Sequence, residues 1–200
     1  MFMRQHLHSE SPCGQCGNRF PRTRQQPRKS CFALPGRSAI TVPVSAQQTK
    51  IEPAVLDDIP QLTELLHDLF SQEPEFRPDA DVQMHGLKMI LEQPNRGRIF
   101  VVRSQNQIIG MINLLFTIST AEGGMVILLE DLVVRHEHRG QGYGTQLLEY
   151  AFNFARQKNF LRITLLTDKI NAATVQFYQK HGFVASEMIP MRYWVKRKPQ

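Results

Sequence analysis

A basic, glycine-rich turn is the feature of this chain with the clearest chemistry. It consists of Arg139, Gly140, Gln141, Gly142, Tyr143, Gly144 and Thr145. Glycine at every second position keeps Cβ atoms away from the backbone, so several N–H groups can point at one anion. A long amphipathic helix follows, and its dipole adds partial positive charge near Thr145. The turn is therefore predicted to bind a phosphate or pyrophosphate.

Two common nucleotide-binding loops do not fit this turn. A Walker A loop ends in Gly-Lys-Ser/Thr, whereas Gly144 is followed directly by Thr145. A dinucleotide fingerprint has the spacing Gly-x-Gly-x-x-Gly, whereas this turn has Gly-x-Gly-x-Gly after an arginine. A flexible hinge is the remaining alternative for the turn.

Two carboxylates interrupt the apolar segment that precedes the turn. Residues 125–134 are apolar on both faces except for Glu130 and Asp131, so this segment is expected to be a central strand. Adjacent strand residues point to opposite faces, and burying an unpaired carboxylate is costly. One of the two side chains must therefore face a cavity or a partner.

The surrounding pattern predicts the elements that position these residues. Strands are expected at 51–54, 98–104, 107–118, 125–134, 161–167, 183–187 and 191–196. Helices are expected from Asp57 or Asp58 to Phe70, through 82–91, after the glycine turn, and from Asn171 to about His181, where Gly182 ends the last one. This order predicts an α/β sandwich around a mixed sheet, antiparallel early and parallel where the long helix crosses over.

The charge is divided unevenly along the chain. Residues 1–50 contain eight Lys/Arg and one acid, a balance of +7, whereas residues 51–200 carry −1. Residues 51–200, the body of the chain, therefore lack the excess of basic residues expected of a nucleic-acid-binding domain. No apolar run is long enough to span a membrane. Residues 1–48 lack apolar periodicity and are expected to be a disordered basic tail before a domain at 49–200. A cytoplasmic protein is expected, with an organellar transit peptide or an over-extended start as alternatives for the tail.

All the cysteines lie in this tail. Cys13, Cys16 and Cys31 leave the body without a disulfide scaffold or a cysteine nucleophile. Together with His6 and His8 they suggest a zinc site, but a second closely spaced pair is missing. We therefore expect no metal.

Two motifs make the body resemble the GNAT superfamily of N-acetyltransferases over residues 51–196. The family's acetyl-CoA motif, Arg/Gln-x-x-Gly-x-Gly/Ala, is matched by residues 139–144. Residues 171–183 resemble its Asn-x-x-Ala-x-x-Phe/Leu-Tyr-x-x-x-Gly-Phe segment, with Thr174 where alanine is usual. The resemblance implies a three-layer sandwich with a mixed central sheet and flanking helices.

The resemblance also implies a binding site for acetyl-CoA. The backbone of Leu132, Val133 and Val134 would bond the pantetheine arm, and the amides of 139–145 would hold the pyrophosphate, with added charge from Arg139 and Arg135. Asn171 would lie beside the cofactor, or serve only as a helix cap. Tyr178 would lie near the thioester sulfur and protonate the departing thiolate, or would only fill the core.

An amine acceptor must lose a proton before it attacks the thioester. The stretch 129–132 is similar to diamine acetyltransferases, in which a glutamate at the place of Glu130 is the base. The alternatives are that Glu130 binds a substrate cation or pairs with an arginine. His85, His136, His138 and His181 are interpreted as solvated or structural.

Taken together, these features indicate direct transfer of an acetyl group to a primary amine in a ternary complex. A non-catalytic acyl-CoA-binding module and a nucleic-acid or metal-binding protein acting through the tail are the alternatives. A cationic acceptor is expected, because Glu73, Glu75, Asp79 and Asp81 make the loop at 73–81 acidic. The alternative is a solvated acidic loop that touches no substrate. A homodimer is a family expectation.

Overall fold

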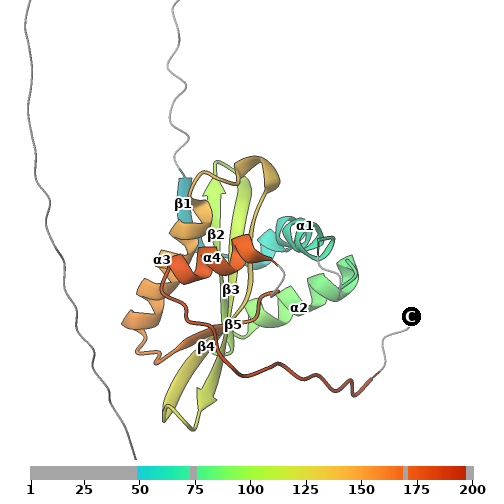
Figure 1. The fold of residues 1–200 in the computed structure, drawn as a ribbon. Helices are drawn as coiled ribbons and strands as arrows, with labels where there is room; N and C mark the ends of the chain where they lie inside the picture. The colour runs from blue at the N-terminus through green and yellow to red at the C-terminus, as the bar shows by residue number, and fades with distance from the viewer. Residues whose placement is uncertain (1–48, 73–75, 169–170, 197–200) are drawn as a thin grey trace, which may run out of the picture. The chain divides into compact units, whose positions relative to one another are not determined.

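The computed structural model describes residues 49–72, 76–168 and 171–196. The sheet contains β1 (Thr49–Pro53), β2 (Gly97–Ser104), β3 (Gln107–Ser119), β4 (Gly124–Val134) and β5 (Ile163–Leu165), in that spatial order (Figure 1). The first four strands pair antiparallel, and β5 pairs parallel to β4. The predicted mixed α/β sheet is thus confirmed. The predictions for residues 1–48, including the zinc ligands, lie outside the described residues.

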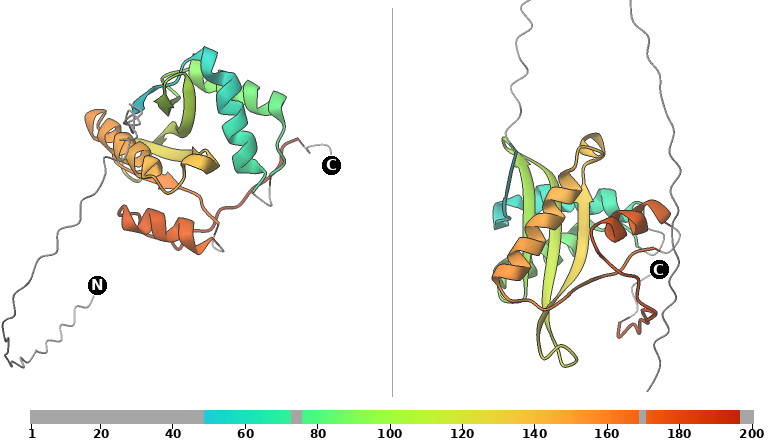
Figure 2. Two further views of the ribbon diagram at one scale, coloured as in Figure 1. Left: turned by 90° about the horizontal axis from the view of Figure 1, so that it is seen from above. Right: turned by 60° about the vertical axis from the view of Figure 1, so that its left-hand side comes forward.

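Helices cover both faces of the sheet (Figure 2). They are α1 (Ile59–Phe70), α2 (Ala80–Glu92), α3 (Tyr143–Gln157) and α4 (Ala172–Lys180). On one face, Leu62 and Leu65 of α1 and Leu87 of α2 pack on the sheet. On the other face, Leu147 and Leu148 of α3 do the same. No helix in the described ranges is both long and apolar enough to cross a bilayer.

The ends of α1 and α2 differ in detail from the prediction. Asp58 occupies the position before α1, but its carboxylate accepts from the Val55 amide and from Arg103 instead of capping the helix. Asp79 caps α2 by accepting from the Val82 amide at 3.2 Å. The predicted acidic loop is therefore shorter, since α2 already begins at Ala80.

A β-bulge in β4 exchanges the faces of its side chains. Leu129 pairs with Leu114 and Asp131 pairs with Asn113, so Glu130 is the extra residue on β4. A shift of one residue moves every later side chain to the opposite face. Leu129 accordingly packs in the α3 core, whereas Val133 packs in the α1–α2 core.

The edge strand β5 is much shorter than its neighbour β4. The predicted strand at 161–167 is reduced to three residues, which pair with Ile127, Leu128 and Leu129. Beyond Leu129, the ladder of β4 within the described ranges involves β3 alone. One edge of the second half of β4 therefore has no paired strand within the described ranges, and we call this stretch the available edge.

The two final predicted strands, 183–187 and 191–196, were wrong. This segment has no strand in the structure, and its apolar side chains, such as Val184 and Tyr193, are 91% exposed. Alternation can predict which residues suit a strand, but a strand also needs a hydrogen-bonding neighbour.

The predicted end of α4 is confirmed. Gly182 has a φ of +90°, where glycine is favoured. The Gly182 amide donates to the Gln179 carbonyl, and the Phe183 amide donates to the Tyr178 carbonyl, as in a Schellman motif. The Phe183 and Tyr178 rings are also in edge contact, at a centroid distance of 5.5 Å. This packing holds Tyr178 firmly at the end of α4.

Candidate functional site

The glycine turn leads from β4 through a short 3-10 turn, η2 (His136–His138), into α3. Gly140 and Gly142 have φ values of +74° and +86°. Such angles disfavour other residues, so the turn depends on glycine at these positions. The helix begins at Tyr143, two residues before the expected start near Thr145. The first N–H groups of a helix lack acceptors within it, so those at residues 143–145 are suited to an anion.

The two arginines near the turn have different surroundings. Arg135 donates to the Ile108 carbonyl and to Glu64, both at 2.8 Å, and its side chain is 14% exposed. Arg139 is exposed and donates to the Val134 carbonyl at 3.0 Å and to Gln72 at 3.3 Å. Arg139 therefore contributes positive charge at the turn, whereas the charge of Arg135 is balanced by Glu64.

The other predicted cofactor residues come from β4 and α4. Leu132, Val133 and Val134 form the half of β4 beyond the bulge, next to its available edge. Asn171 caps α4 by accepting from the Thr174 amide at 3.1 Å. The capping role of Asn171 is thus observed, and its place beside a cofactor stays a prediction.

Tyr178 is buried at the inner side of α4. Burial, and then the negative charge of Asp131, raise the pKa of its hydroxyl to about 12. The hydroxyl is consequently protonated throughout the neutral range.

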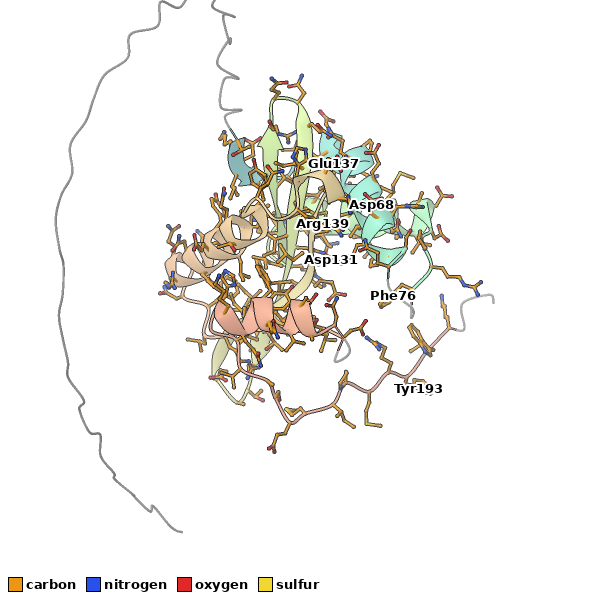
Figure 3. All side chains as sticks on the ribbon, turned by 45° about the horizontal axis from the view of Figure 1, so that its top comes forward. Asp68, Phe76, Asp131, Glu137, Arg139 and Tyr193 are labelled. Carbon is orange, nitrogen blue, oxygen red and sulfur yellow. The ribbon has the colours of Figure 1, made fainter. Side chains whose placement is uncertain are left out.

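The two β4 carboxylates have contrasting environments. Glu130, at the bulge, is exposed. Asp131 is 8% exposed and accepts a 2.8 Å hydrogen bond from Asn113 Nδ2. Burial raises the pKa of Asp131 to about 6; the Asn113 hydrogen bond lowers it, and the charge of Glu130 raises it. In Figure 3, Asp131 and Arg139 lie between α1 and α4.

Sequence reasoning missed Asn113 and did not foresee the contacts of His181. It gave no role to Asn113, which β3 brings opposite Asp131 although the two are 18 positions apart. His181, interpreted as solvated or structural, has its Nδ1 2.7 Å from the Phe177 carbonyl and its Nε2 3.1 Å from Thr145 Oγ1. His181 thus joins the end of α4 to the glycine turn. A polar asparagine inside the apolar β3 run was the available signal for the first.

The structure gives little support for a role of the acidic loop at 73–81 in the site. Glu73 and Glu75 lie outside the described residues. Asp79 is engaged as the cap of α2, and Asp81 belongs to its first turn. The buried Asp131 is a more specific basis for the electrostatics of the site than this loop.

Comparisons with known proteins agree with the fold. A model of the acetyltransferase (GNAT) family matches residues 59–183. Streptothricin acetyltransferase A of Bacillus subtilis (strain 168) is 36% identical over 66 residues, which are 33% of this chain and 38% of that protein. The chain thus matches well under half of that relative's length.

Solved structures share the fold at low identity. A possible acetyltransferase from Clostridium difficile 630 has a TM-score of 0.68 at 20% identity, with coverage of 74% of this chain and 99% of that one. A predicted acetyltransferase with acetyl-CoA from Clostridium acetobutylicum has a TM-score of 0.61 at 20% identity, with coverage of 72% of this chain and 96% of that one. At these identities the likeness shows the fold.

Proposed function

The chain belongs to the acetyltransferase (GNAT) family, and from this premise we propose that it transfers an acetyl group from acetyl-CoA to a primary amine. The observation that carries the proposal is the glycine turn at the start of α3, placed directly after the half of β4 that has an available edge. This arrangement suits a ligand that has an extended polar arm and a pyrophosphate.

The turn fits the phosphate end of acetyl-CoA. An ideal Cβ on Gly140 would meet no atom within 4 Å, and one on Gly142 would only reach Gln146 at 4.0 Å. The backbone is thus approachable at both positions. The amides of 139–145 and the Arg139 guanidinium would hold the pyrophosphate.

The edge of β4 fits the pantetheine arm. The backbone groups of Leu132, Val133 and Val134 would bond the arm as a neighbouring strand does. Asn171 would lie alongside it at the start of α4. When bound, acetyl-CoA supplies the activated acetyl group as a thioester.

The chain's own residues would carry the protons. Tyr178, which is protonated throughout the neutral range, would donate its proton to the sulfur as the C–S bond breaks. Glu130, at the exposed bulge, would accept the proton that the amine loses, directly or through water. Residues 49–200 contain no cysteine, and we propose direct attack by the amine instead of an acetyl-enzyme.

The proposal is tested by following CoA release with a panel of primary amines. Release that depends on the amine, with the acetylated product found by mass spectrometry, is expected. Tight binding of acetyl-CoA without release for any amine would instead support a non-catalytic acyl-CoA-binding module.

A further inference from the structure

The C-terminal end of α4 contacts the start of α3 at two adjacent residues. The ring of Phe177 packs on Gly144, where an ideal Cβ would lie 3.6 Å from Phe177 Cζ. Beside this contact, His181 Nε2 lies 3.1 Å from Thr145 Oγ1. Gly144 and Thr145 belong both to the glycine turn and to the first turn of α3. The end of α4 therefore touches the residues whose N–H groups are suited to an anion.

The second ring nitrogen of His181 determines the direction of its hydrogen bond to Thr145. Nδ1 lies 2.7 Å from the Phe177 carbonyl oxygen, which can only accept, so Nδ1 carries a proton. In the neutral ring Nε2 is then an acceptor, and the Thr145 hydroxyl donates to it. The Phe177 and His181 rings are also in contact, at a centroid distance of 4.6 Å. The His181 ring is thus held in one orientation, with Nε2 directed at Thr145.

Thr145 connects this contact to the anion-binding backbone. It is the third residue of α3, and its own N–H is among those that lack an acceptor within the helix, since the first such bond is donated by Gln146. Its side chain is half-buried and held by His181. Because the side chain and the amide belong to one residue, a fixed hydroxyl also restricts the direction of the Thr145 N–H. His181 can therefore act on a bound anion through Thr145.

The charge of His181 changes this contact. Histidine ordinarily gains or loses its proton between pH 5 and pH 8. In the protonated ring Nε2 becomes a donor to Thr145 Oγ1, so the hydroxyl proton of Thr145 is free to turn to a phosphate oxygen. The positive charge of the ring also lies next to the N-terminus of α3. Both changes favour a bound anion.

Other charged and titratable groups surround His181. Those whose charge is ordinarily constant between pH 5.5 and pH 8 are Arg156 and Arg162, which line one cavity with His181, the Glu122 partner of Arg162, Glu149 one turn beyond Thr145, and Lys180. Tyr178 stays protonated in this range. His136 and His138 of η2 precede the turn and ordinarily titrate in the same range, so the experiment compares proteins that share them.

We propose that His181 is a positioning residue for acetyl-CoA, that it orients the first turn of α3 through Thr145, and that acetyl-CoA binds more tightly when the His181 ring is protonated. The proposal rests on the proposed function, because it takes the pyrophosphate of acetyl-CoA to be the anion held at residues 139–145. Binding of acetyl-CoA is then accompanied by proton uptake at His181.

The test uses the full chain and measures the Kd for acetyl-CoA by calorimetry at pH 8 and at pH 5.5. His181→Gln keeps an amide that can bond the Thr145 hydroxyl but has no titrating group. From pH 8 to pH 5.5, the ratio of the His181→Gln Kd to the parent Kd should rise about tenfold, the gain of one hydrogen bond to a charged group. His136, His138 and the phosphates of acetyl-CoA titrate with both proteins, so the ratio reports on His181.

Two further variants test the route through Thr145. At pH 8, Thr145→Val, which removes the hydroxyl, and His181→Phe, which keeps a ring on Phe177, should each raise the Kd for acetyl-CoA about fivefold. The double variant should bind no more weakly than either single variant, because both changes remove the same contact. His181→Gln should keep the parent Kd at pH 8. The matched control His85→Gln, at an exposed position of α2, should behave as the parent protein at both pH values.

The results distinguish this inference from the proposed function. A parent protein that binds no acetyl-CoA at either pH would remove the proposed function itself. If the parent protein binds acetyl-CoA but the Kd ratio stays constant between the two pH values, or Thr145→Val keeps the parent Kd, the role of His181 is refuted and the proposed function stands. Additive effects in the double variant would likewise refute it. Should His181→Phe not fold, Thr145→Val and His181→Gln decide the outcome by the same criteria.

Discussion

The buried charge of Asp131 should lower the stability of the native protein at neutral pH. Its pKa is raised from 3.8 in a model peptide to about 6 in the folded chain. A carboxyl whose folded pKa is raised contributes stability below the unfolded value and loses it as the pH rises through the folded value. The shift of about two pH units corresponds to a cost of about 3 kcal/mol above pH 7.

Asp131→Asn should therefore stabilise the protein at pH 7.5 by up to about 3 kcal/mol, because asparagine keeps the shape and an acceptor for Asn113 without the charge. At pH 4 the gain should fall below about 1 kcal/mol, since Asp131 is then largely protonated in the folded state. Urea denaturation followed by circular dichroism at both pH values measures the two differences.

The difference in unfolding free energy between Asp131→Asn and the parent protein at one pH does not contain the titration of other groups, because these titrate in both proteins. Glu52, whose pKa is lowered by hydrogen bonds from Lys50 and Arg103, loses its contribution at low pH in both proteins alike. A variant that is less stable than the parent protein at pH 7.5, or a gain of equal size at both pH values, would refute the reasoning.

Three more changes test the remaining parts of the site. Tyr178→Phe should lower kcat by about 10²–10⁴-fold with little change in acetyl-CoA affinity, and full activity in steady-state assays would remove its role as the acid. Gly142→Val should raise the Kd for acetyl-CoA at least tenfold in calorimetry, because φ at this position is +86° and a side chain would cover the backbone amides. The control Gly86→Ala, in the middle of α2, should leave this Kd unchanged and increase the stability of the protein by roughly 0.5–1 kcal/mol. A chain that starts at Thr49 should match the full chain in Tm and acetyl-CoA binding; a lower Tm, or stoichiometric zinc in the full chain, would contradict this.

Local patterns predicted most of the fold. Leucines at helical spacing predicted α1, and the apolar run at 125–134 predicted the central strand β4, which pairs with β3 on one side and β5 on the other. Glycine after α4 predicted its Schellman ending. These features are determined by residues close together in the sequence, which single-sequence reasoning can use.

Features that depend on register or on distant partners were not predictable. The bulge at Glu130 leaves no mark in the alternation of β4, yet it decides that Asp131 meets Asn113. The contact between His181 and Thr145 likewise joins residues 36 positions apart. The strands expected after Phe183 failed because alternation does not specify a pairing partner.

The central claim is that the chain transfers an acetyl group to an amine from acetyl-CoA bound at the turn between β4 and α3, and one measurement tests it most directly. The full chain is incubated with acetyl-CoA and 1,4-diaminobutane, or another amine of the panel, and free CoA and acetylated amine are quantified together. The account predicts equal amounts of the two products in the parent protein and strongly reduced amounts in Tyr178→Phe. CoA release without acetylated amine, or no release with any amine tested, would contradict it.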